Sequence, residues 1–195
     1  MLVPHRSKAE PEGIDEDTHW DLLQQCLHDE DLPLDVRAAG SLLLLFGQHL
    51  THVSALTTGH LGVQDSHHTI RLDSTPIRLP QTLATLLTRL VEQQPRQGWS
   101  GNTPVTLLFP GSRPGTHRSA SSLARALSRH GIPIRPSRAT ALIQLAEEMP
   151  PAVLAPLPGL HVITALQWRR RAATDWTAYL QARQQAIGRP RQNTS

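Results

Sequence analysis

The apolar positions of the chain recur at helical spacing over most of its length. Leucine and alanine repeat at intervals of three and four residues, which is typical of helices with one buried face. The pattern predicts helices over 19–28, 34–47, 51–56, 81–92, 119–130 and 137–149. The segment 34–47 is almost entirely apolar and ends at Gly47, so we expect it to be the central helix of the core.

The first predicted helix follows a segment rich in proline, glycine and acidic residues. Asp17 or Thr18 is placed to cap its first turn, because either side chain can accept a hydrogen bond from a backbone N–H group. Trp20, Leu23 and Leu27 share one face, which we expect to turn inward. Residues 1–32 are therefore expected to form an acidic leader with a short helix.

Two short segments change to the two-residue alternation of strands. Residues 69–72 and 76–79 alternate apolar and basic side chains, with turn-forming residues between them. This pattern predicts a small antiparallel β-hairpin with Arg71 and Arg78 on one face. The apolar run 105–109 predicts a short buried strand or extended segment. The expected fold class is mainly α with a small antiparallel β-sheet.

The charge of the chain is unevenly distributed. Residues 1–35 contain ten acidic and two basic side chains, whereas residues 36–195 contain six acidic and seventeen basic ones. A basic body favours a polyanionic partner. The alternative is a solvated surface in a sequence biased toward arginine, since the chain has 18 arginines and a single lysine.

Length and composition indicate one domain with tails. With 195 residues and 38% hydrophobic side chains the chain can bury a core, which we place at 33–187, followed by a flexible tail at 188–195. The single cysteine excludes a disulfide framework within the chain, and no apolar run is long enough to span a membrane. His49 and His52 are three positions apart but lack a third metal ligand at a defined spacing. We expect a cytoplasmic, nucleoid-associated protein without metal or cofactor.

Five stretches resemble, in order and spacing, the catalytic domain of the tyrosine recombinases, the phage-integrase family. The family's motifs are a Gly-Leu-Arg turn between two helices, a β-hairpin with a Pro-Leu-Pro-like end, a linker before the next helix, a His-x-x-Arg-His-Thr box and a Leu-Gly-His box. The corresponding stretches here are LLLLFGQHL with SAL (42–56), the hairpin at 71–80, LFP with the helix after Ser119 (108–130), RPSRAT (135–140) and LPGL (157–160). The resemblance implies a tyrosine-recombinase-like fold and double-stranded DNA as the partner.

The same resemblance implies that the cleavage chemistry is incomplete. The family uses a tyrosine nucleophile, two arginines on the phosphate and further acid and base groups. His49 falls on the first arginine of the family, Arg135 on the histidine and Arg138 on the second arginine. The nucleophile position falls on Trp168 or Arg169.

Three further departures concern lysine, histidine and tyrosine. The only lysine is Lys8, so the hairpin has none, and Leu160 falls on the family's next histidine. The only tyrosine, Tyr179, lies about three helical turns, or roughly 15 Å, beyond the nucleophile position. We therefore expect DNA binding without strand cleavage, and the alternative is Tyr179 as a relocated nucleophile.

Basic clusters are the predicted DNA contacts, in addition to His49 and the two hairpin arginines. The cluster of Arg135 and Arg138 lies at a predicted helix start, where backbone N–H groups also favour phosphate. The clusters are Arg135 with Arg138, then Arg113 with His117 and Arg118, then Arg169, Arg170 and Arg171.

A helix-turn-helix regulator is an alternative interpretation of residues 139–171. In that interpretation 161–171 is the recognition helix, and His161, Thr164 and Gln167 face bases. Pro156 and Pro158 count against it, because each removes a hydrogen bond from the first helix. A second alternative is a protein-interaction adaptor on the same fold. The C-terminal helix is also a candidate surface for homo-oligomer formation.

Overall fold

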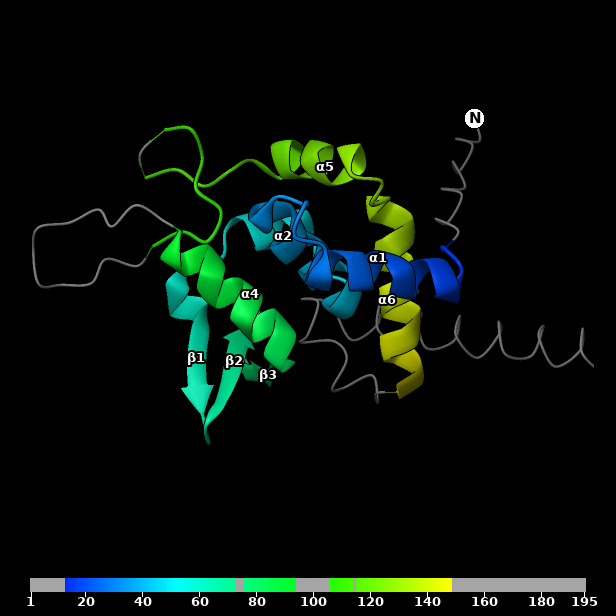
Figure 1. Cartoon of the computed structure of the whole chain (residues 1–195), viewed down its shortest axis with the longest axis horizontal. Helices are drawn as coiled ribbons and strands as arrows, with labels where there is room; N and C mark the ends of the chain where they lie inside the picture. The colour runs from blue at the N-terminus through cyan, green and yellow to red at the C-terminus, as the bar shows by residue number, and fades with distance from the viewer. Residues whose placement is uncertain (1–12, 73–75, 94–105, 114, 149–195) are drawn as a thin grey trace, which may run out of the picture.

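The structure, a computed structural model, describes residues 13–72, 76–93, 106–113 and 115–148. In this part of the chain the helices pack against one another, and a small sheet projects from one end of the helical body (Figure 1). The order of elements is α1 (Glu16–His28), α2 (Leu34–Phe46), α3 (Leu50–Ser54), a 3-10 turn (Thr58–His60), β1 (Leu61–Gln64), β2 (His67–Arg71), β3 (Pro76–Arg78), α4 (Gln81–Glu92), α5 (Ala120–Arg129) and α6 (Ile134–Glu148). The predicted fold class is confirmed.

Helix α2 is the centre of the core. It contacts α1, α3, α4, α5 and α6, and its leucines at positions 42, 43 and 44 are at most 1% exposed. A helix that is apolar on all sides is stable only when other elements cover every side. Gly47 ends α2 in the left-handed conformation, at φ 58°, and its N–H donates to the carbonyl of Leu43. The prediction for this helix is confirmed.

Helix α1 begins earlier than predicted and buries a different face. Asp15, and not Asp17 or Thr18, is the N-cap, since its carboxylate accepts a hydrogen bond from the Thr18 N–H at 2.9 Å. The buried residues are His19, Leu23 and Cys26, whereas Trp20 is 48% exposed and Leu27 is partly buried. The predicted stripe was therefore wrong by about one position, and α1 packs against α2 as part of the same core.

A buried arginine joins α1 to α2. Arg37, in the first turns of α2, is 4% exposed and donates through Nε to the Cys26 carbonyl at 3.1 Å. Its Nη2 donates to the Leu27 carbonyl at 2.7 Å. The last carbonyls of a helix lack partners within the helix, and a cation there also opposes the negative end of the helix dipole. Arg37 thus caps the C-terminal end of α1.

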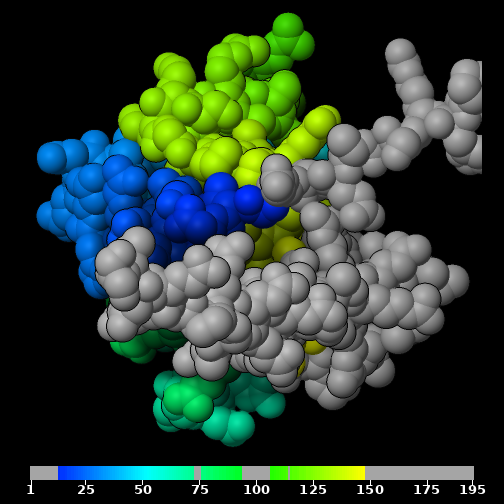
Figure 2. Space-filling model, turned by 90° about the vertical axis from the view of Figure 1, so that its right-hand side faces the viewer, coloured from blue at the N-terminus to red at the C-terminus, as the bar shows by residue number. Residues whose placement is uncertain are grey.

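The sheet has three antiparallel strands in the order β1-β2-β3, one more than predicted. Strand β1 was missed because it is short and mostly exposed and because its turn to β2, Asp65-Ser66, carries no glycine. Both turn residues have positive φ, 48° and 64°, as a two-residue hairpin turn requires. Figure 2 shows the cyan to green strand region projecting at the lower end of the molecule.

The predicted hairpin is confirmed, and its arginines lie as expected. Arg71 is paired with Pro76, and Arg78 with Thr69, so both arginines lie on one face and the paired residues Ile70 and Ile77 on the other. Both arginines are exposed, while Ile70 is fully buried.

The remaining elements differ little from prediction. Helix α4 has the predicted bounds, and α5 is capped by Ser119. Helix α6 begins at Ile134, before the predicted Ser137, because Pro136 lies in the first turn, where a missing N–H costs nothing. The segment 106–109 is buried at Leu108 and Phe109 but forms no strand: Leu107 makes an isolated bridge with Thr57, and residues 108–109 are bends. The helix-turn-helix segment after residue 149, with its recognition helix at 161–171, and the C-terminal helix lie outside the described residues.

Candidate functional site

The turn after α2 brings His49 to the start of α6. A Cβ atom on Gly47 would lie 2.8 Å from the Leu142 side chain and 3.6 Å from the Arg138 carbonyl, so the turn packs closely on α6. His49 follows two residues later as the N-cap of α3. The glycine allows the left-handed turn and the close approach together.

A pocket of about 490 Å³ lies between α3, α5 and α6. Small side chains of α5 leave the space open, and none of the described residues that line it is acidic. The lining residues are Gln48, His49, Leu50, Thr51, Ala120, Ser121, Ala124, Ile134, Arg135, Arg138 and Ala139. The structure therefore brings together three of the predicted site residues, His49, Arg135 and Arg138.

Arg138 carries unsatisfied hydrogen-bond donors in this pocket. Its Nε and Nη2 atoms are buried and have no hydrogen-bond partner among the described residues. These two nitrogens form one edge of the guanidinium plane, the fork that binds two oxygens of a phosphate or carboxylate. Burial also lowers the pKa of Arg138. A buried charge without an acceptor is costly, which points to an anion as the group that this fork binds.

His49 shares the positive environment of Arg138. Burial lowers the pKa of His49, and the neighbouring Arg138 and His52 lower it further. The rings of His49 and His52 lie edge to face, with their centres 6.1 Å apart. All three effects lower the pKa of His49 and favour the neutral imidazole in the free protein.

The cluster predicted in the loop 110–118 is only partly available to a ligand. Arg118 forms an ion pair with Asp35 at the start of α2 and donates through Nε to the Ser122 hydroxyl at 3.2 Å. Its charge is therefore largely neutralised within the fold. Arg113 and His117 are exposed.

The remaining predicted contacts lie away from the pocket or outside the described residues. Arg71 and Arg78 are on the exposed face of the sheet and do not line the pocket. Outside the described residues are Arg169, Arg170, Arg171, His161, Thr164 and Gln167, together with Trp168 and Tyr179.

The sequence did not predict the contribution of α5 to the pocket. Ala120, Ser121 and Ala124 line one wall, and Ser121 and Thr51 add hydroxyl groups. The only signal was a run of small residues at the start of this helix.

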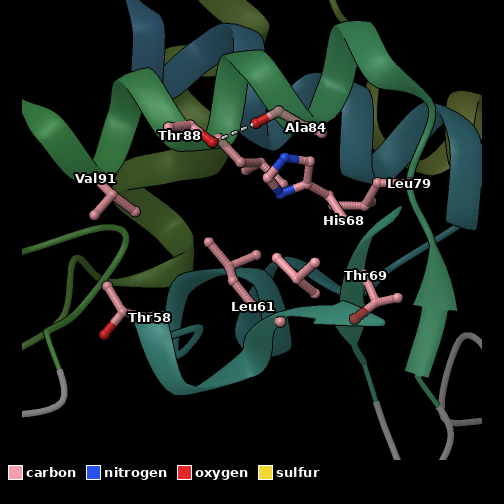
Figure 3. Close-up of a pocket in the computed structure, with 11 residues that line it drawn as sticks. Thr58, Leu61, His68, Thr69, Leu79, Ala84, Thr88 and Val91 are labelled. Carbon is pink, nitrogen blue, oxygen red and sulfur yellow. Dashed lines mark hydrogen bonds between the residues drawn. The ribbon is translucent and has the colours of Figure 1, made fainter. Parts of the chain in front are cut away.

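A second, apolar cavity of about 280 Å³ lies between α4 and the sheet (Figure 3). Leu61, Leu79 and Val91 line it, and the His68 ring reaches toward the turn of α4 where Thr88 donates to the Ala84 carbonyl. None of its described lining residues is an arginine, in contrast to the pocket at Arg138.

The described residues include no cluster of metal ligands and no membrane-spanning helix. Within them no three histidine, cysteine or acidic side chains are grouped so that they could hold a metal ion. Nor does any helix among the described residues have the length and hydropathy to cross a membrane.

Neither a protein-family model nor a curated protein sequence matches the chain. Solved structures do. The XerA recombinase superposes with a TM-score of 0.60 at 17% identity over 94% of this chain and 69% of its own. The chain has a tyrosine-recombinase fold.

Two further structures with this fold were solved with DNA. The Tn1549 transposon integrase, in complex with a circular intermediate DNA, superposes with a TM-score of 0.59 at 13% identity over 91% of this chain and 68% of its own. The XerH site-specific recombinase, bound to its palindromic difH substrate, superposes with a TM-score of 0.60 at 12% identity. That match covers 88% of this chain and 53% of the XerH chain, so this chain spans about half of that recombinase.

Proposed function

We propose that the chain binds double-stranded DNA and does not cleave it. The donor fork of Arg138 carries the proposal, because it has no partner among the described residues and lies in a pocket whose described lining includes no acidic residue. A phosphodiester supplies two oxygens at the spacing of this fork and the negative charge that the pocket lacks. The tyrosine-recombinase fold and the DNA complexes of the integrase and XerH support DNA as the source of the phosphate.

The absence of cleavage follows from the residues that surround the phosphate. A neutral imidazole at His49 offers one donor and cannot form the second bidentate clamp that an arginine would form. The chain has no lysine beyond Lys8 and a single tyrosine, Tyr179. A catalytic unit that lacks several of its members loses orders of magnitude in rate.

DNA affinity measured across a series of salt concentrations tests the binding. Affinity for a labelled duplex should fall steeply with salt, because each phosphate contact releases counterions. Arg138→Ala should weaken binding and reduce the salt slope by about one contact. Arg125→Ala, on the exposed surface of α5 and outside the pocket, is the matched control and should change both quantities less. Equal effects of the two substitutions would place the DNA elsewhere.

The arginine cluster at 169–171 is tested in the same assay. Replacing Arg169, Arg170 and Arg171 by alanine should lower both the affinity and the salt slope. An unchanged slope would remove the cluster from the interface.

A nicked suicide duplex tests the absence of cleavage, because it traps any covalent phosphotyrosyl product. We expect no covalent band. A band that disappears in Tyr179→Phe would contradict the proposal and identify Tyr179 as a relocated nucleophile.

A further inference from the structure

The histidine in the pocket gives the proposed DNA site a property that an arginine would not have. We propose that binding of a DNA phosphate in this pocket is coupled to protonation of His49, so that affinity rises as the pH falls. This inference rests on the proposed DNA binding. It assigns to His49 the role of a proton-dependent phosphate contact.

Among the described residues, the side chains around His49 are positive or neutral. Helix α6 contributes Arg135 and Arg138, and α3 contributes His52. The wall formed by α5 is Ala120, Ser121 and Ala124, and the end of the α2 turn contributes Gln48. No carboxylate is among the described residues that line the pocket, so none of these side chains compensates a proton on His49.

A bound phosphate reverses this balance. It places a negative charge beside the imidazole and occupies the fork of Arg138, whose charge otherwise repels a proton on His49. The pKa of His49 should therefore be higher in the complex than in the free protein. Because linkage is reciprocal, a ligand that raises the pKa of a group binds more tightly when that group is protonated.

The sign and size of the effect follow from this linkage. Above the pKa of the complex His49 is neutral in both states, and affinity does not depend on its proton. Below the pKa of the free protein, which lies under about 6.5, it is charged in both states and affinity reaches its upper plateau. Between these limits affinity rises as the pH falls. Charge-assisted hydrogen bonds are about twice as strong as neutral ones, so the gain should be about tenfold.

DNA affinity measured at constant ionic strength, from about pH 8 to about pH 5.5, tests the coupling, since this range brackets the usual imidazole pKa. The wild type should gain about tenfold across the range, and His49→Gln should lose most of that gain. His49→Arg should bind tightly at both ends. His28→Gln removes an exposed imidazole that does not line the pocket and should keep the wild-type gain.

The pH response also separates failure of the coupling from failure of DNA binding. A gain in His49→Gln equal to that of the wild type would assign the response to the other histidines and refute the coupling. DNA binding that is absent at every pH would refute the proposed function itself.

A second measurement needs no variant. Inorganic phosphate or the duplex should raise the titration midpoint of the His49 imidazole in an NMR titration of the wild type. An unchanged midpoint on saturation with the duplex would overturn the inference.

Discussion

Replacing Arg138 by methionine should make the fold more stable while it weakens DNA binding. Methionine keeps the length of the side chain and a similar helix propensity but removes the charge. Two nitrogens of Arg138 are buried without a partner among the described residues. A buried unsatisfied donor costs about 1–3 kcal/mol. Because the rest of the side chain is partly exposed, we expect a net gain of about 1 kcal/mol, or roughly 2–4 °C in melting temperature.

Urea denaturation of the wild type and Arg138→Met measures the free energy of unfolding, and a DNA titration measures affinity. The variant should lose about tenfold to a hundredfold in affinity, the value of a hydrogen bond to a charged group. Arg125→Met at an exposed position of α5 is the matched control and should change stability by less than about 0.5 kcal/mol. A loss of more than about 1 kcal/mol in Arg138→Met would show that the guanidinium stabilises the free protein, which would refute the reasoning.

Two further substitutions and one chemical modification test the packing around α2. Gly47→Ala should cost about 1–2 kcal/mol in urea denaturation, because alanine is strained at φ 58° and would contact the Leu142 side chain; a neutral effect would mean that the turn relaxes. Arg37→Met should cost about 1.5–3 kcal/mol by the same assay, because it leaves the Cys26 and Leu27 carbonyls without their charged donor; unchanged stability would contradict the capping role. Burial raises the pKa of the Cys26 thiol to about 12, so iodoacetamide at about pH 8 should modify it only at the rate of unfolding, and rapid labelling of the folded protein would contradict this.

The elements that the sequence predicted are those with a strong local signal. Helix α2 is a continuous apolar run closed by a glycine, and α4 has a clear apolar stripe. Strand β1 was missed because Val63 is 69% exposed and the strand has little apolar alternation. The face of α1 was misplaced because Trp20 is exposed although it is among the most apolar residues of the helix. Burial of His19 in its place is a tertiary effect that periodicity does not report.

The candidate site was predictable only where the family resemblance provided an alignment. His49 and Arg138 lie far apart in the sequence, and no local pattern indicates that they meet. The ion pair between Arg118 and Asp35 is equally long-range, and the sequence pattern did not indicate it. The contribution of α5 to the pocket depends on how α3, α5 and α6 pack together. No pattern within one segment of the sequence indicates this packing.

The position of the pocket at the end of α2, and not within the core, has a consequence for mutational tolerance. The leucines that hold the helices together point into the interior, whereas His49 and Arg138 face a cavity beside it. Substitutions of the polar side chains at His49 and Arg138 leave the buried leucines of α2 unchanged. The scaffold can therefore exchange one polar group for another at these positions, and with it the chemistry of the cavity, while its folding remains intact.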